Sequence, residues 1–209
     1  MYKSPEQLIK RFTKENPELA AISVSLHNIY ETIKDSYVGG GKLLLCGNGG
    51  SAADCDHIVS ELMKGFLLKR PLPNEFVTHP ALDGEGLLLQ GALPAISLPS
   101  QICLYTAIVN DVTPEMAYAQ QVYGLGKSGD VLIGISTSGN AVNVCRALRV
   151  ARAMGIKTIG LTGKTGGYMY SLCDICLCVP ASDTYRIQEF HIPIYHTLCA
   201  MLESAFFTS

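Results

Sequence analysis

The chain has 209 residues, of which 48% are hydrophobic and 16% charged, and its formal net charge at pH 7 is −2. This composition is typical of one well-buried globular domain and argues against a disordered chain. No basic tract, no membrane-length apolar run and no apolar signal core is present, so we expect a soluble, cytoplasmic protein without nucleic-acid or membrane partners.

Strands and helices alternate along the sequence, as judged from hydrophobic periodicity and from proline and glycine. In chain order we predict a helix over 4–38 broken near Asn16 and Pro17, a buried strand over 42–47, a helix over 51–66, irregular structure over 65–92, a strand over 93–98 and helical segments near 100–109 and 114–123. The rest of the chain predicts strands over 130–135, 156–163 and 174–180, helices over 140–155 and 184–206, and a short helix over 165–173.

This alternation indicates βαβ units and therefore an α/β fold with a mainly parallel sheet covered on both faces. No domain boundary is apparent. In the helix over 51–66, Ser51 is expected near the N-cap and Asp54 in the first turn. Pro193 lies inside the closing helix, and we expect it to kink this helix or to free the carbonyl of Glu189.

The eight cysteines are interpreted as reduced thiols that mostly act as small hydrophobic side chains. Cys173 and Cys176 form the spacing Cys-x-x-Cys, which can indicate zinc. No second such pair completes a four-thiolate site, and the stretch alternates like a buried strand. Structural zinc at these cysteines is therefore disfavoured.

Two predicted strands end in similar loops, Gly47–Ser51 and Ser136–Asn140, and each loop leads into a helix. Ligands of open parallel sheets bind at the carboxyl ends of the strands. The hydroxyls of Ser136, Thr137 and Ser138, together with free amides at a helix N-terminus, favour an anion such as a phosphate. The alternative is a capping turn without a ligand.

Residues 47–52 also fit the dinucleotide pattern Gly-x-Gly-x-x-Ala. That pattern requires an acidic residue about 20 positions further on, at the end of the next strand. The next predicted strand, 93–98, lies far downstream and carries no acid. A dinucleotide-binding dehydrogenase is therefore disfavoured, and no Gly-Lys-Ser/Thr sequence supports a kinase-type phosphate loop.

His57 and Glu61 are four residues apart, so they share one helix face and are candidates to hold a metal ion. The closing helix adds Gln188, His191 and His196. Helix geometry alone pairs Gln188 with His191, whereas Gln188 and His196 are separated by about 12 Å along an ideal helix. The alternative is that these are ordinary helix residues with satisfied histidines.

Five segments, 47–62, 109–122, 129–144, 162–169 and 186–196, together resemble the sugar isomerase (SIS) family, most of all its phosphoheptose isomerase branch. The resemblance covers nearly the whole chain except residues 65–92, so 1–209 is expected to be a single SIS domain with 65–92 as an inserted loop. It implies a five-stranded parallel sheet flanked by helices, with N-terminal helices and a long C-terminal helix. It also implies a homotetramer with active sites between subunits.

The same resemblance implies the roles of individual residues in a zinc-dependent aldose–ketose isomerase. The expected metal ligands are His57, Glu61, Gln188 and His196, and the expected catalytic residues are Glu61 and His196, whose acid and base roles can be exchanged. Contacts to a sugar phosphate are expected from Asn48, Gly49, Gly50, Ser51, Glu61, Asn110, Asp111, Ser136, Thr137, Ser138 and Gln188. The implied reaction converts sedoheptulose 7-phosphate into D-glycero-D-manno-heptose 7-phosphate through an enediolate.

Three departures from the family pattern bear on this prediction. Ala141 stands where the family usually has a serine, which removes a hydrogen bond worth about 1.5–3 kcal/mol to a charged ligand. The segment 65–92 exceeds the usual connection by roughly 20 residues, so it can cover the active site and change the substrate. Tyr185 stands where some members have an acid, which puts the local sugar contacts in doubt.

The alternatives are an isomerase of another sugar phosphate, a non-catalytic SIS protein that binds a replication initiator, and a sensor that binds a sugar phosphate without converting it. The retained set His57, Glu61, Gln188 and His196 favours an enzyme, because a binding protein needs no metal ligands. Fold alone does not fix function.

Overall fold

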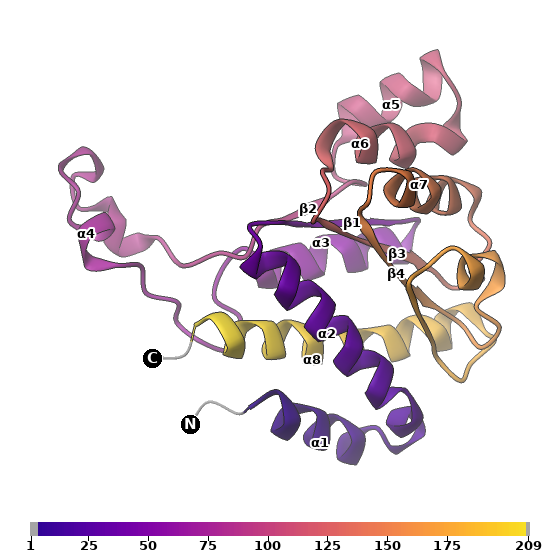
Figure 1. Ribbon diagram of the computed structural model, residues 1–209, viewed down its shortest axis with the longest axis horizontal. Helices are drawn as coiled ribbons and strands as arrows, with labels where there is room; N and C mark the ends of the chain where they lie inside the picture. Colours follow the sequence, from indigo (N-terminus) through magenta and orange to yellow (C-terminus); the bar gives the residue numbers. More distant parts are fainter. Residues whose placement is uncertain (1–3, 208–209) are drawn as a thin grey trace.

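A computed structural model describes residues 4–207 and contains a five-stranded parallel sheet between two layers of helices (Figure 1). The strand order is β2-β1-β3-β4-β5, and each neighbouring pair is parallel. This confirms the predicted α/β fold. The strands are β1 (Leu43–Gly47), β2 (Ala95–Ser97), β3 (Val131–Ser136), β4 (Lys157–Thr162) and β5 (Ile175–Cys178).

Successive residues of β1 face opposite sides of the sheet and so contribute to two separate hydrophobic cores. Leu43 and Leu45 lie in the larger core, whereas Leu44 and Cys46 lie in the smaller one. Because both faces are buried, the central strands are apolar along their whole length, which is the pattern that the sequence shows.

The larger core is covered by α1 (Pro5–Glu15), α2 (Ser23–Val38), α3 (Gly50–Leu62) and α8 (Thr184–Phe206). The smaller core is covered by α6 (Ala117–Leu125) and α7 (Val142–Ala153), with α5 (Ile102–Asp111) packed beside α6 (Figure 1). Short 3-10 helices, η1 (Pro17–Ile22), η4 (Pro114–Met116) and η5 (Gly167–Ser171), complete these layers.

The start of α3 differs from the prediction. Gly49 is the N-cap residue, with φ 57°, and the helix begins at Gly50. Ser51 is therefore a buried residue of the first turn and not a cap, and Asp54 follows the first turn, which has no acidic residue. The reason is the positive φ, which glycine adopts without steric cost and which lets the helix begin earlier than the serine suggested.

The helix α8 continues through Pro193 from Thr184 to Phe206. Proline has no N–H, so the carbonyl of Glu189 lacks its usual donor four residues on, as predicted. The carbonyl of Pro193 itself accepts a hydrogen bond from the Thr197 hydroxyl at 2.7 Å. The helix thus accommodates the proline without ending at it.

Residues 71–90, here called the arm, contain three short helices, α4 (Asn74–Val77), η2 (Pro80–Leu82) and η3 (Glu85–Leu88). The segment is thus less irregular than predicted. The arm projects away from the sheet and carries α4 (Figure 1). Leu87 and Leu88 on it are 79% and 83% exposed.

The base of the arm is fixed to the core. The amide of Gly91 donates to the carbonyl of Arg70 at 2.8 Å, which closes the base. The fully buried Arg70 guanidinium donates to Glu203 on α8 at 2.8 Å and to the carbonyls of Glu61 and Leu62 at 2.9 and 2.6 Å. Glu203 also accepts the amides of Phe66 and Leu67, each at 2.8 Å.

All eight cysteines are free. Most are buried or half-buried as predicted, but Cys103 on α5 is exposed. Among residues 4–207, no helix is both long and apolar enough to cross a membrane.

Candidate active site

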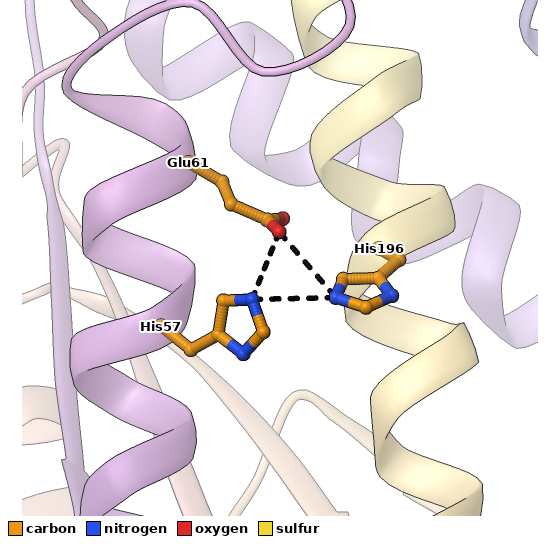
Figure 2. A group of neighbouring side chains, drawn as sticks. All are labelled: His57, Glu61 and His196. Carbon is orange, nitrogen blue, oxygen red and sulfur yellow. Dashed lines mark hydrogen bonds and ion pairs between the residues drawn. The ribbon is translucent and has the colours of Figure 1, made fainter.

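Three ligand-bearing side chains from two helices converge beside the sheet (Figure 2). His57 and Glu61 share one face of α3, and Nε2 of His57 lies 3.0 Å from Oε1 of Glu61. His196 comes from α8, and its Nε2 lies 3.4 Å from the same oxygen and 3.4 Å from Nε2 of His57. The structure therefore unites three of the four predicted metal ligands, and it includes His196 and not His191.

The three side chains differ in their access to solvent. Glu61 is buried, whereas the side chains of His57 and His196 are 46% and 36% exposed. Burial lowers the pKa of His196. The charge of Glu61 opposes this shift, and the charge of His57 adds to it. A neutral imidazole is the form that binds a metal ion.

The donor set fits a zinc ion. Two imidazole nitrogens and a carboxylate oxygen are typical zinc ligands, and ligand atoms about 2.1 Å from a tetrahedral zinc lie about 3.4 Å from each other. The three observed separations are 3.0, 3.4 and 3.4 Å. The second oxygen of Glu61, Oε2, is also buried, and a buried carboxylate is stabilised by a cation beside it.

A second layer of side chains holds this group, and the sequence analysis did not identify it. The hydroxyl of Tyr195 lies 3.1 Å from Nδ1 of His57 and 3.4 Å from Oδ1 of Asp54. Burial raises the pKa of Tyr195. Burial also raises the pKa of Asp54, and the hydrogen bond from Tyr195 and the charge of His57 oppose that rise. The ring of Phe66 lies against His196, with centroids 5.8 Å apart.

A hollow of about 340 Å³ lies at the carboxyl ends of β1 and β3. Both loops that the sequence analysis singled out contribute to it. Its lining consists of Asn48, Gly49, Gly50, Ser51, Ile135, Ser136, Thr137, Ser138, Ala141, Thr184 and Gln188. Eight predicted sugar-phosphate contacts, among them Gln188, which is also a predicted metal ligand, are thus brought together in one place, beside the N-termini of α3 and α7.

Ala141 is the N-cap residue of α7 and has no side chain that can accept a hydrogen bond there. The N-terminal amides of a helix carry partial positive charge and bind anions. The start of α7 therefore borders the hollow at Ala141, next to the hydroxyls of Ser136 and Ser138, while the amide of Val144 in its first turn donates to the side chain of Asn143 at 3.0 Å.

Close backbone contact fixes the Ser136–Asn140 loop. Gly139 has φ 66°, and a Cβ atom there would collide with the carbonyl oxygen of Gly166. Met169 donates its amide to Gly139 at 2.9 Å, and Tyr168 donates its amide to the side chain of Asn140 at 2.8 Å. The loop is thus held against η5 and presents its hydroxyls from a rigid support.

The Gln188 amide packs against the first residue of α3. A Cβ atom on Gly50 would collide with Nε2 of Gln188, so the absence of a side chain at Gly50 makes room for this amide. Gln188 therefore lies on α8 between the hollow, which it lines, and His196 two turns further along the helix.

Asn48 is oriented by two residues that the sequence analysis missed. It exchanges two hydrogen bonds of 2.9 Å with the side chain of Asn143, at the start of α7. The Tyr118 hydroxyl donates to the carbonyl of Gly47 at 2.5 Å and lies 3.3 Å from Oδ1 of Asn48. Asn143 has a sequence signal, its place in the first turn of a helix after a polar loop, whereas Tyr118 has none.

Asn110 and Asp111 lie elsewhere. They are exposed at the C-terminal end of α5, where Asn110 donates to Asp111 at 2.8 Å, and they do not line the hollow. His191 is fully buried beside the backbone of Thr162, and burial lowers its pKa to about 4. Tyr185 is exposed next to Thr184, and Arg186 pairs with Glu189 at 2.8 Å.

Comparison with known proteins shows the family of this chain. The SIS domain model matches residues 101–206. A phosphoheptose isomerase of Roseiflexus sp. (strain RS-1) is 40% identical over 199 residues, which are 95% of this chain and 88% of that protein. One of Aliarcobacter butzleri is 40% identical over 201 residues, 94% and 96% of the two chains.

Solved structures agree as well. The phosphoheptose isomerase GmhA from Neisseria gonorrhoeae has a TM-score of 0.75 and 32% identity, covering 94% of this chain and 93% of its own. The one from Francisella tularensis has a TM-score of 0.73 and 30% identity, covering 85% and 84%. The chain therefore belongs to the SIS domain family of sugar-phosphate isomerases. Within that family it belongs to the phosphoheptose isomerases, and it is an enzyme.

Proposed function

We propose that this enzyme converts sedoheptulose 7-phosphate into D-glycero-D-manno-heptose 7-phosphate with the help of a zinc ion. The observation that carries the proposal is the convergence of His57, Glu61 and His196 on the same two helices, α3 and α8, that border an anion-binding hollow. The names of the relatives support a seven-carbon sugar phosphate as the substrate.

The phosphate end of the substrate is assigned to the hollow. Ser136, Thr137 and Ser138 offer three hydroxyls, and the N-terminus of α7 beside them adds the partial positive charge of a helix start. Hydrogen bonds to an ionised phosphate are stronger than those to a neutral group. Asn48, Gly49, Gly50, Ser51 and Gln188 line the same hollow and are assigned to the phosphate and the adjoining sugar hydroxyls.

The metal ion is assigned to His57, Glu61 and His196, with Gln188 as the fourth ligand. A bound zinc ion would act as a Lewis acid that polarises the oxygens on C1 and C2 of the sugar. The protein's own contribution is to hold two imidazoles and one buried carboxylate on rigid helices.

Proton transfer is assigned to Glu61 and His196. Glu61 removes a proton from C1 of the ketose, and the electron pair of that C–H bond forms the C1–C2 double bond of an enediolate as the carbonyl oxygen on C2 becomes an alkoxide. His196 moves the hydroxyl proton from the oxygen on C1 to the oxygen on C2. Glu61 then returns its proton to C2, and the electrons left on the oxygen of C1 form the carbonyl of the aldose. Acid and base groups positioned in this way contribute about 10²–10⁴-fold to the rate.

We further propose that residues 1–209 form a single SIS domain with 65–92 as an insertion, and that the enzyme is a cytoplasmic homotetramer. Asn110 and Asp111 are exposed and lie outside the hollow. We assign them to the sugar site of a neighbouring subunit. Their exposure outside the hollow is the support for active sites between subunits.

The deciding experiment measures turnover of sedoheptulose 7-phosphate by the purified full chain, first after chelation and dialysis and then with added zinc. Formation of the aldose phosphate only with zinc supports the proposal. Fructose 6-phosphate is tested in parallel. If the zinc-loaded, folded enzyme converts that ketose and not the heptulose, the assigned substrate is wrong while the isomerase chemistry stands.

A further inference from the structure

A chain of three polar side chains lies behind the proposed metal site. Nδ1 of His57 points away from Glu61 and lies 3.1 Å from the hydroxyl of Tyr195, which lies 3.4 Å from Oδ1 of Asp54. We infer that Tyr195, held by Asp54, is a positioning residue that fixes His57 in the tautomer with its proton on Nδ1. This inference rests on the zinc site proposed above.

The argument follows from the single proton of the Tyr195 hydroxyl. The Tyr195 hydroxyl donates this proton to Oδ1 of Asp54 at 3.4 Å, and its oxygen keeps lone pairs that can accept. The lone pairs of the tyrosine oxygen then accept a hydrogen bond, and His57 can provide it only if Nδ1 carries a proton. In that tautomer the Nε2 lone pair points toward Glu61 and His196, as a metal ligand requires.

The opposite tautomer gives a different site. A proton on Nε2 of His57 could be donated to Glu61 at 3.0 Å, and this hydrogen bond would occupy the position of the metal. The Tyr195 proton would then turn to Nδ1 and leave Asp54 without a donor. Oδ2 of Asp54 is already buried without a hydrogen-bond partner among the described residues, so loss of the bond to Oδ1 would be costly.

The surroundings restrict this chain to one geometry. Tyr195 is 1% exposed and Asp54 9% exposed, so water has little access to replace either partner. The Tyr195 ring also packs edge-on against the rings of His57 and His196, with centroids 5.3 and 5.0 Å away. The same residue thus sets both the tautomer of one proposed ligand and the ring planes of two.

The test compares zinc affinity in Tyr195→Phe and the wild type by competition with a chromogenic chelator, at a temperature where circular dichroism shows both to be folded. Removing a residue that orients a ligand typically weakens metal affinity about 10- to 100-fold, and we expect a loss in this range. Tyr30→Phe, which changes a buried tyrosine on α2, is the matched control and should bind zinc like the wild type.

Two further readouts separate positioning from simple stabilisation. Nitrogen-15 NMR of His57 should show the Nδ1–H tautomer in the wild type and a mixture in metal-free Tyr195→Phe. The double variant Tyr195→Phe, Asp54→Asn should bind zinc no more weakly than Tyr195→Phe alone, because both residues act through one chain of hydrogen bonds.

An affinity within twofold of the wild type in folded Tyr195→Phe overturns this inference and leaves the zinc site standing. A wild-type chain that binds no zinc overturns the inference and the zinc site together. A His57 tautomer that is unchanged by the substitution also overturns the inference, even if zinc affinity falls.

Discussion

Oε1 of Glu61 lies 3.4 Å from Nε2 of His196, although the two residues belong to different helices, α3 and α8. The same oxygen also lies 3.0 Å from Nε2 of His57. One carboxylate oxygen thus joins both imidazoles, so a change at Glu61 should affect the metal site and the proton transfer at the same time.

Replacing Glu61 by Gln should reduce kcat at least 100-fold, because an amide has nearly the same shape but cannot accept a proton from carbon. The measurement is steady-state turnover at saturating zinc, with circular dichroism to check the fold. Glu31→Gln, on the surface of α2, is the matched control. Turnover of Glu61→Gln within threefold of the wild type would exclude Glu61 as the base.

Zinc should raise the melting temperature of the chelated protein. A ligand at 100 times its Kd stabilises the folded state by about 2.7 kcal/mol, which corresponds to roughly 5–10 °C for a chain of this size. Differential scanning fluorimetry measures the shift. His57→Ala should abolish most of it and His27→Ala, an exposed histidine of α2, should keep it; equal shifts in both variants would place the bound zinc elsewhere.

Ala141→Ser should tighten phosphate binding. A serine at this N-cap would add a hydroxyl at a position where Ala141 has none. A hydrogen bond to a charged group is worth about 1.5–3 kcal/mol, or roughly 10- to 100-fold in Kd. Isothermal titration with the substrate phosphate measures the change. Ala153→Ser, at the far end of the same helix, is the control, and an unchanged Kd in Ala141→Ser would show that the phosphate does not contact this residue.

Acid should destabilise the protein through His191. Burial lowers the pKa of His191 from 6.5 to about 4, so between these values the unfolded chain binds a proton that the folded chain does not. Stability then falls as pH decreases from about 6.5 to 4, by up to about 3 kcal/mol.

Urea unfolding at pH 7.5 and pH 5 tests this pH dependence. The difference in unfolding free energy between the two pH values should be smaller in His191→Gln than in the wild type. His27→Gln removes an exposed histidine and should leave the difference unchanged. If His191→Gln kept the wild-type difference in unfolding free energy between the two pH values, His191 would be charged in the folded protein.

Arg70→Met should be strongly destabilising. Arg70 and Glu203 are both fully buried, and removing one partner of such a pair leaves an uncompensated buried charge at a cost of about 3–5 kcal/mol. Urea unfolding should show this loss, with partial recovery in the double variant Arg70→Met, Glu203→Gln. Arg11→Met breaks an exposed pair with Glu15 and should cost less than about 1 kcal/mol; equal losses in both single variants would contradict the argument.

The sequence was sufficient for the order and type of the main elements. The apolar strands around Leu45 and Ile133 and the long amphipathic helix ending near Phe206 carry strong periodic signals, and all appear where predicted. The pairing of His57 with Glu61 also follows from helical spacing alone. The start of α3 was misplaced, because a serine after glycines looks like a cap while the positive φ of Gly49 is invisible in the sequence.

The choice of His196 required the family resemblance, because spacing along α8 favoured His191. The structure gives the physical reason for the choice: His191 faces the core, whereas His196 faces α3 across the site. Tyr195 and Asp54 were not identified, because no local pattern reveals that a tyrosine on one helix lies against an aspartate and a histidine on another. Such contacts depend on how α3 and α8 pack together.

The hydrogen bond between Gly91 and Arg70 has an engineering consequence. It brings the two ends of the arm together, and Glu203 on α8 holds Arg70 at this base through a hydrogen bond in which the arm itself takes no part. The arm comprises residues 71–90, which is about the excess length expected of the insertion. Because closing a loop costs little more when the loop is longer, this position suits the exchange of whole segments. A short turn, an affinity tag or a second small domain grafted between Arg70 and Gly91 would leave the proposed metal ligands on supports that it does not touch.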